Sequence, residues 1–264
     1  HLSIRRQRQM CIRDSYKFVQ ERPMVGQIKT LTVKRDAVGR LWLVFSVKEQ
    51  MPIAKTSTGQ SGGFDFGLKM FLTDDQGRGY PSPQFFAQGL NKTRRLHRQL
   101  SRKVEGSKRY KRARRALAKH SGHIADQRRD YHFKLAHHLC DEYALLCFED
   151  LNLEGMKRWW GRKVSDLGFG KFLNILEWVA LKRGSRFVKI NRWERTTQKC
   201  SGCQRDHTLT LRDRMLHCVC GLTMDRDHNA AINIKTVGTS TGYRSDSQTK
   251  VRLRSRVEGR SPRL

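Results

Sequence analysis

Four of the seven cysteines lie within one short segment, in the pattern Cys200-x2-Cys203 followed by Cys218-x-Cys220. Tetrahedral zinc requires four ligands, and a two-residue spacer lets both sulfurs of a knuckle face one metal ion. The second pair has a one-residue spacer, so a set in which His217 replaces Cys218 stays open, as does a segment without metal. With either ligand set, protein side chains fill all four coordination positions of the zinc ion, so the site would be structural rather than catalytic. We therefore expect one structural zinc ion in a zinc ribbon over 196–222, rather than a disulfide framework.

Positive charge dominates the composition. The chain has 54 Lys and Arg against 24 Asp and Glu, a formal net charge of +30 over 264 residues. Each phosphate that a cationic side chain neutralises releases condensed counterions, so this surplus favours a nucleic acid partner over a merely solubilising surface. No apolar run in the sequence is long enough to span a bilayer, so no membrane partner is expected.

The two ends of the chain are expected to lie outside the folded domain. The stretch from Leu2 to Ser15 resembles translated sequencing-adapter read-through, so 1–15 is interpreted as non-native and Cys11 receives no role. The chain begins with His1 rather than Met, which suggests a truncated N-terminus. The tail at 237–264 is rich in Ser, Thr, Gly and Arg, has no apolar period, and is expected to be disordered and basic.

Several segments show strand patterns. Alternating apolar and polar residues over 26–48, around a turn at 37–39, predict a β-hairpin, the remnant of an N-terminal β domain over 16–52. A small-residue linker follows at 52–63. A buried strand is expected from Phe64, with a turn at 74–77 and a returning strand. Further strands are expected at 144–150 and 186–193.

Helical patterns alternate with these strands, which predicts a mixed α/β domain. Helices are expected at about 91–119, 122–142 and 166–183, with a last one from Asp227. Between 91 and 135 the chain has 16 Lys and Arg and 3 acids. The first helix has a thin apolar stripe, so its other faces are solvated or contact phosphate. Cys140 and Cys147 are flanked by apolar residues and are expected to be inert core thiols.

Three carboxylates lie at the edges of ordered elements: Asp65, Glu149 and Asp227. Asp65 lies between Phe64 and Phe66, where a lone charge is costly unless it is paired or binds a cation. Each acid also has a simpler interpretation: Asp227 as a helix cap, Glu149 as an arginine partner, Asp65 as a satisfied polar residue. Together they could hold two divalent metal ions that clamp an in-line phosphodiester displacement. Mg²⁺ prefers such oxygen ligands.

Four segments resemble, in order, the TnpB (OrfB) family encoded by insertion sequences, an ancestor-like relative of type V CRISPR effector nucleases. They are GGFDFGLKMFLT, QRRDYHFKLAHHLCDEYALLCFEDLNLEGM, WERTTQKCSGC and CGLTMDRDHNAAINI. The similarity runs from about 26 to 236. It implies an α/β, RNase H-like (RuvC-like) mixed sheet with helices and an inserted zinc ribbon. The nuclease domain then covers 61–195, with basic helices at about 91–142, and its final helix covers 223–236.

The resemblance also implies roles for single residues. Asp65, Glu149 and Asp227 match the catalytic acids that hold Mg²⁺, with two ions expected. Asp225 matches a commonly acidic position that is not counted as catalytic, and Asn229 is expected to cap or orient the last helix. Phosphate contacts are expected from five arginines of the basic helices: Arg94, Arg98, Arg109, Arg112 and Arg115. Trp159 and Trp160 either stack on bases or anchor a loop.

The leading functional prediction is a metal-dependent, RNA-guided DNA endonuclease of transposon origin, with DNA as substrate and a guide RNA as partner. We expect it in a prokaryotic cytoplasm, on the nucleoid when bound to DNA. The family usually has CxxC in its second knuckle and a longer N-terminal part that helps bind guide RNA. The alternatives are a catalytically incompetent, truncated DNA- or RNA-binding protein and a DNA-joining transposase, because fold analogy does not separate these reactions. The sequence does not indicate the oligomeric state.

Overall fold

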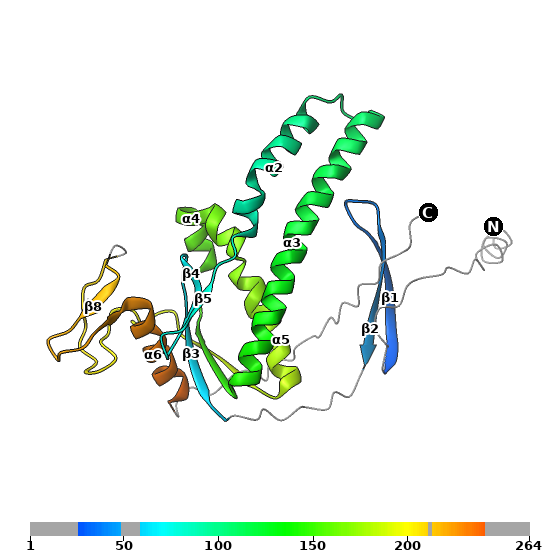
Figure 1. The fold of residues 1–264 in the computed structure, drawn as a ribbon. Coiled ribbons are helices and arrows are strands. Elements are labelled where there is room, and N and C mark those ends of the chain that lie inside the picture. The colour runs from blue at the N-terminus through cyan, green and yellow to red at the C-terminus, as the bar shows by residue number, and fades with distance from the viewer. Residues whose placement is uncertain (1–25, 49–58, 211–212, 241–264) are drawn as a thin grey trace.

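A five-stranded mixed sheet organises the protein in the computed structural model, which describes residues 26–48, 59–210 and 213–240 (Figure 1). Its strand order is β5-β4-β3-β6-β7. The strands are β3 (Ser61–Phe66), β4 (Met70–Asp74), β5 (Gly79–Pro81), β6 (Leu145–Glu149) and β7 (Arg186–Ile190). β5, β4 and β3 pair antiparallel, whereas β3, β6 and β7 run parallel. The predicted α/β class with a mixed sheet is confirmed.

Helices cover both faces of this sheet. They are α2 (Phe85–Ser101), α3 (Lys108–Glu142), α4 (Leu153–Leu167), α5 (Phe169–Arg183) and α6 (Arg226–Thr239). On one face, α3 and α5 pack over an aromatic core that includes Tyr143 and six phenylalanines: Phe64, Phe66, Phe71, Phe148, Phe169 and Phe172. The rings of Phe64 and Phe148 stack with centroids 5.0 Å apart across β3 and β6. Burial of these rings is the main favourable contribution to the stability of this layer.

The opposite face of the sheet packs directly against α6. An ideal Cβ built on Gly63 of β3 would lie 2.2 Å from the carbonyl oxygen of Ala231, so the helix and the strand approach backbone to backbone. A Cβ on Gly238 would lie 2.4 Å from the Sγ atom of Cys147 on β6. Side chains alternate along a strand. The carboxylates of Asp65, two residues after Gly63, and Glu149, two residues after Cys147, are therefore on the α6 face.

The interpretation of Cys140 and Cys147 as core thiols is confirmed. Both are buried, and burial raises the pKa of each thiol to about 12. At neutral pH both are therefore protonated and unreactive as nucleophiles.

The helix boundary predicted near 120–122 is wrong. α3 is continuous for 35 residues, and the break lies between α2 and α3 instead. There Gly106 has a φ of +79°, and the Ser107 hydroxyl caps α3 by accepting a hydrogen bond from the Tyr110 N–H at 3.0 Å. Gly122 lies inside α3, where a glycine costs only about 1 kcal/mol relative to alanine. A capping serine after a left-handed glycine therefore fixes the boundary.

Other predicted boundaries also shift. β3 begins at Ser61, inside the expected linker, and the chain turns after Phe66 rather than continuing as one strand to the turn at 74–77. Gly67 N–H donates to the Phe71 carbonyl at 3.4 Å in this extra turn. The predicted helix at 166–183 corresponds to α5 alone, because Gly168 has a φ of +66° and separates it from α4, which was not predicted. β7 ends at Ile190 rather than 193, and α6 continues to Thr239.

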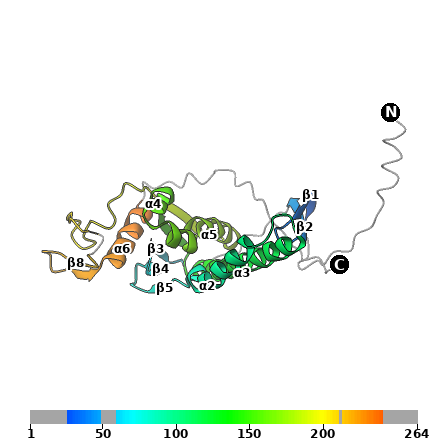
Figure 2. The same cartoon turned by 90° about the horizontal axis from the view of Figure 1, so that it is seen from above.

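Two smaller sheets lie at opposite ends of the molecule (Figure 2). β1 (Gln27–Arg35) and β2 (Leu41–Lys48) form the predicted antiparallel hairpin, and β8 (Met215–His217) pairs with β9 (Thr223–Asp225) in the cysteine-rich segment. The residues at 1–15 with Cys11, and the tail at 241–264, lie outside the described residues. No helix among those described has the length and apolar character needed to cross a membrane.

The close approach of α6 and β3 gives a test of the fold. In Gly63→Ala the new methyl group would overlap main-chain atoms of α6, so we expect destabilisation by about 1–3 kcal/mol or more. Gly122→Ala is the matched control, because an ideal Cβ there meets nothing within 4 Å. It should stabilise the chain by about 0.5–1 kcal/mol. Urea unfolding measures both, and an unchanged midpoint for Gly63→Ala would contradict the packing.

Candidate active site

Two of the predicted acids lie side by side on neighbouring strands. Phe64 of β3 pairs in parallel register with Phe148 of β6, so the next residues, Asp65 and Glu149, follow at equivalent positions. Adjacent strands are about 4.8 Å apart. Both carboxylates lie at the carboxyl ends of their strands, on the face covered by α6. Parallel pairing therefore brings together two acids that are 84 positions apart in the chain.

The third acid comes from the first turn of α6. Asp225 is the N-cap of this helix: its Oδ1 atom accepts hydrogen bonds from the N–H groups of Asp227 at 2.8 Å and His228 at 3.3 Å. Asp227 is therefore not the cap, and its side chain is available for another purpose. An ideal Cβ on Gly67, one residue beyond β3, would lie 3.7 Å from Asp227 Oδ2. This places Asp227 over the end of β3, beside Asp65.

The electrostatics show that the three acids interact. Burial raises the pKa of Asp65 well above its ordinary value, and the negative charges of Asp227 and Glu149 raise it further. Burial also raises the pKa of Glu149, opposed by a hydrogen bond from Thr196 Oγ1 to Glu149 Oε2 at 3.4 Å. Carboxylates so arranged repel one another, and a cation between them would remove the repulsion. The predicted acids therefore form one cluster.

Two arginines that the sequence analysis missed contact Asp227. Arg226 Nη2 lies 3.3 Å from Asp227 Oδ1, and Arg214 Nη1 lies 3.2 Å from Asp227 Oδ2. The Arg226 side chain is 13% exposed, whereas that of Arg214 is 53% exposed. The charge of Arg226 also opposes the rise in the pKa of Asp65. The sequence signal was the placement of Arg226 between Asp225 and Asp227.

The four cysteines form a tighter group than the three acids. Among the described residues, Cys200, Cys203, Cys218 and Cys220 are the one set of potential ligands whose ligand atoms all lie within 4.8 Å of one another. The Sγ atoms of Cys200 and Cys220 are 3.7 Å apart, and those of Cys203 and Cys218 are 3.5 Å apart. Tetrahedral zinc with Zn–S bonds of about 2.3 Å separates its sulfurs by about 3.8 Å. The cysteine cluster therefore fits a zinc ion, and its spacing is too long for disulfides, which have S–S bonds of about 2.05 Å.

His217 does not belong to the cysteine cluster. Its Nδ1 atom lies 3.3 Å from the Thr223 hydroxyl, across the β8–β9 pair. His217 is the last residue of β8, and Cys218 directly follows the strand. The group of potential metal ligands includes Cys218 and not His217. The side chain of Cys218 is the one directed toward the cluster, so the set in which His217 replaces it is not supported.

Of the two roles predicted for Asn229, to cap or to orient α6, the capping role is wrong. Asn229 does not cap α6, because Asp225 occupies that position. It is fully buried, donates from Nδ2 to the Lys199 carbonyl at 2.7 Å and accepts from the Ser201 N–H at 2.8 Å. Asn229 thus fastens the segment around Cys200 to α6. Contacts of this kind have no local sequence signal, since the partners are 30 positions apart.

Two protein-family models match the chain. A family described as "Probable transposase" (OrfB_IS605) matches 44–160, and one described as "Cas12f1-like, TNB domain" matches 169–234. The second match contains both knuckles of the cysteine cluster and Asp227. Over these two ranges the chain is similar to the TnpB/OrfB transposase family and to the Cas12f1-like TNB domain. The resemblance seen in its sequence motifs is thereby confirmed.

Individual proteins are similar to the chain over most of its length. The chain is similar to a Streptomyces pristinaespiralis protein named "Putative RNA-guided DNA endonuclease", with 31% identity over 90% of this chain and 60% of that protein. It is also similar to "TnpB-like protein L770" of Acanthamoeba polyphaga mimivirus, with 27% identity over 86% of this chain and 47% of that protein. The chain thus spans between about half and three fifths of these two relatives.

A solved structure of a CRISPR-Cas12f ternary complex shares the fold. It superposes on 81% of this chain and 46% of its own chain, with a TM-score of 0.51 and 18% sequence identity. At this identity the likeness concerns the fold alone. It agrees with the RuvC-like, RNase H-like architecture expected from the TnpB/OrfB motifs.

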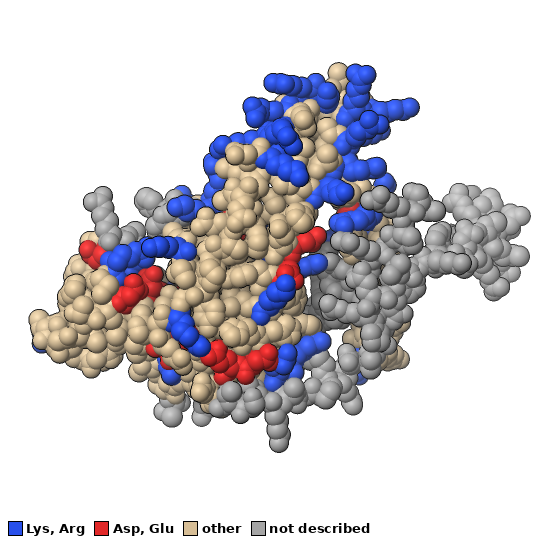
Figure 3. Space-filling view, viewed as in Figure 1, with Lys and Arg blue, Asp and Glu red and all other residues tan. Residues whose placement is uncertain are grey.

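The five arginines predicted to contact phosphate all lie on the α2–α3 hairpin, away from the three acids. Arg94, Arg98, Arg109, Arg112 and Arg115 are exposed. Lys and Arg side chains cover the projecting end of the hairpin in Figure 3. Arg115 is 20 residues before Leu135 in the core, or about 30 Å along α3. The side chains of Trp159 and Trp160 lie outside the described residues, so the two interpretations of this pair are not tested.

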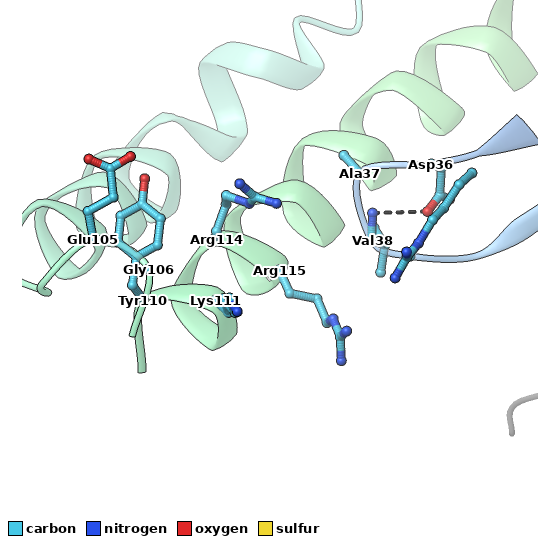
Figure 4. Close-up of a pocket in the computed structure, with 11 residues that line it drawn as sticks. Asp36, Ala37, Val38, Glu105, Gly106, Tyr110, Lys111, Arg114 and Arg115 are labelled. Atoms are coloured by element: carbon cyan, nitrogen blue, oxygen red, sulfur yellow. Dashed lines mark hydrogen bonds between the residues drawn. The ribbon is translucent and has the colours of Figure 1, made fainter. Parts of the chain in front are cut away.

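A groove separates the end of this hairpin from the β1–β2 turn (Figure 4). Its volume is about 610 Å³, and its cationic side chains are Arg35, Lys111, Arg114 and Arg115. Although burial opposes the effect, hydrogen bonds from Arg40 and Trp42 lower the pKa of Asp36, in the turn, to about 2. The groove is distant from the three acids, so it is a candidate for binding a polyanion rather than for catalysis.

The raised pKa of Asp65 predicts how stability depends on pH. A carboxyl whose folded-state pKa is raised favours folding when protonated, so the stability of the metal-free chain falls as pH rises from about 3.8 toward the raised value. Asp65→Asn removes the repulsion, and at pH 7 it should raise Tm by at least about 2 °C. Calorimetry of parent and variant at pH 4 and pH 7 tests this. A variant no more stable than the parent at pH 7 would contradict the electrostatic description.

Proposed function

We propose that this protein is a metal-dependent DNA endonuclease of transposon origin that cleaves phosphodiester bonds under the guidance of an RNA. The observation that carries the proposal is the convergence of Asp65, Glu149 and Asp227 on one face of the sheet. The match to the transposase family model supports it, as does similarity to a relative named as a putative RNA-guided DNA endonuclease. This relative is longer than the chain, so guidance and target choice are part of the proposal.

The donor set at the three acids fits Mg²⁺. All three offer carboxylate oxygens, the ligands that hard divalent cations prefer. Burial raises the pKa of Asp65, and the negative charges of Asp227 and Glu149 raise it further. A cation bound among the three acids would oppose this rise. Two bound Mg²⁺ ions would supply Lewis acidity toward the attacking and leaving oxygens of a phosphodiester. Asp65, Glu149 and Asp227 are the residues that would hold them.

Neighbouring residues support this chemistry in distinct ways. Thr196 is buried and holds one oxygen of Glu149, which fixes the orientation of that carboxylate. Arg226 neutralises part of the charge of Asp227. Arg214 is more than half exposed, so its guanidinium can approach a phosphate next to the acids. The cysteine cluster would hold one structural zinc ion beside this site.

A cleavage assay tests the proposal directly. We expect the parent to cut labelled single-stranded DNA with Mg²⁺ and not with EDTA. Asp65→Asn should lower the rate by more than about 100-fold, because one metal ligand is lost. It should leave DNA binding intact, since the phosphate-binding surface is elsewhere. The control is Asn174→Ala, an exposed position on α5 that should cut like the parent.

The same assay separates the alternatives. Strand-joined products would indicate a DNA-joining transposase. Tight binding without Mg²⁺-dependent turnover in either protein would indicate a chain that only binds nucleic acid. Cutting that survives Asp65→Asn would assign the activity to another site and refute the role of the three acids.

Neutralising the α2–α3 hairpin tests the binding surface. Arg109, Arg112 and Arg115 are exposed on α3, and their triple change to Gln should weaken DNA binding uniformly across sequences. The slope of log K against log salt should become shallower by about 0.7–0.9 for each phosphate that the variant no longer neutralises. Fluorescence anisotropy at several salt concentrations measures this slope.

A matched variant controls for the reduced total charge. Changing Lys171, Arg186 and Lys189 to Gln removes three exposed cations from α5 and β7. This control should keep the salt slope of the parent. Equal slopes for the two triple variants would mean that the hairpin has no special role in binding.

A further inference from the structure

Two buried asparagines on α6 face the cysteine cluster. Asn229 and Asn233 are four residues apart, so they lie on the same side of the helix. They are 0% and 4% exposed. A buried amide without partners costs about 1–3 kcal/mol, so its hydrogen bonds strongly constrain what packs against it.

Both asparagines hold the main chain of one segment, 196–201. Asn229 donates to the Lys199 carbonyl at 2.7 Å and accepts from the Ser201 N–H at 2.8 Å. Asn233 Nδ2 donates to the carbonyls of Thr196 at 2.8 Å and Lys199 at 2.7 Å. Cys200 lies between the held residues, so the first knuckle of the cysteine cluster is fixed to α6 by these hydrogen bonds.

The same segment reaches the acids. The Thr196 hydroxyl donates to Glu149 Oε2 at 3.4 Å, and Thr196 is 3% exposed. The helix that carries the asparagines also carries Asp227 in its first turn. One segment therefore contacts Glu149 at its start, includes a cysteine ligand at its end, and is tied to the helix of a third acid.

We propose that Asn229 and Asn233 are positioning residues that couple the cysteine cluster to the acids, so that metal binding by the cysteines raises the metal affinity of Asp65, Glu149 and Asp227. The inference rests on the proposed function for the identity of the second metal site. Coupling of this kind is reciprocal, because each site changes the affinity of the other by the same factor.

A second set of contacts holds α6 to the sheet. Because of these contacts, loss of the metal ion from the cysteine cluster would displace α6 rather than unfold it. On the sheet side, Lys235 Nζ forms an ion pair with Asp75 Oδ2 at 2.6 Å, and His228 Nε2 lies 3.1 Å from the Asp75 carbonyl. These contacts do not involve the cysteine segment. Without a metal at the cysteines, α6 keeps this attachment but loses the fixed partner of its two asparagines.

Metal binding at the acids, measured directly, tests the coupling. Mn²⁺ replaces Mg²⁺ as the probe, its free concentration is read by electron paramagnetic resonance, and Asp65→Asn defines the binding that depends on the acids. We expect Asn233→Ala to weaken this binding by about tenfold, in the range seen when a residue that orients a metal ligand is removed. The parent stripped of zinc, with the chelator removed, should show the same weakening. Asn174→Ala on α5 should bind Mn²⁺ like the parent.

Each further outcome has one meaning. Asp65-dependent Mn²⁺ binding that is unchanged in both Asn233→Ala and the zinc-stripped parent would overturn the coupling and leave the proposed function intact. Absence of Asp65-dependent binding in the parent would overturn the metal site and the inference together. If Asn233→Ala does not fold, Thr196→Val replaces it in the test. This change removes only the Thr196 hydroxyl that donates to Glu149. Circular dichroism and zinc content of each variant separate a failure of coupling from a failure to fold.

Discussion

The main-chain contact between α6 and β3 determines the rest of the candidate active site. Because Gly63 has no side chain, α6 approaches the strand closely enough for its first turn to lie over the end of β3. That approach brings Asp227 beside Asp65, while the parallel pairing of β3 and β6 supplies Glu149. Any side chain at position 63 would lift the helix and separate the acids.

Repulsion among the three acids lowers the stability of the metal-free chain. The surrounding structure keeps the acids together in spite of this repulsion. The aromatic core beneath the sheet holds β3 and β6 in place, so repulsion between Asp65 and Glu149 cannot be relieved by moving the strands. Arg226 and Thr196 relieve part of the repulsion by contacting Asp227 and Glu149. In the proposed function, a divalent cation bound by the acids would remove the remainder. The same residues would then lower the stability of the metal-free chain and hold the metal ion.

Charge is divided between two distant regions of the protein. The cations of the α2–α3 hairpin project away from the sheet (Figure 3). The three acids lie on the α6 face of the sheet, on the side opposite the aromatic core. α3 is 35 residues long, about 50 Å, and connects the two regions rigidly. A polyanion held along the hairpin would not neutralise the acids, which stay free for metal ions.

The sequence predictions came from residue types and short-range patterns: four cysteines with zinc-ligand spacing, three acids at element ends, a large cationic surplus, and an α/β order of strands and helices. Such features are visible in a sequence directly. The structure confirms the α/β class and brings the four cysteines together. Three other features came only from the packed structure. Asp225 rather than Asp227 caps α6, Asn229 and Asn233 hold the segment of Cys200, and Arg214 and Arg226 contact Asp227. The helix break at Gly106 rather than near Gly122 belongs with them, since a glycine inside a helix and a glycine that ends one look alike in sequence. The physical reason is that these features depend on contacts and backbone conformations that are settled when the elements pack together, and residue type does not display them.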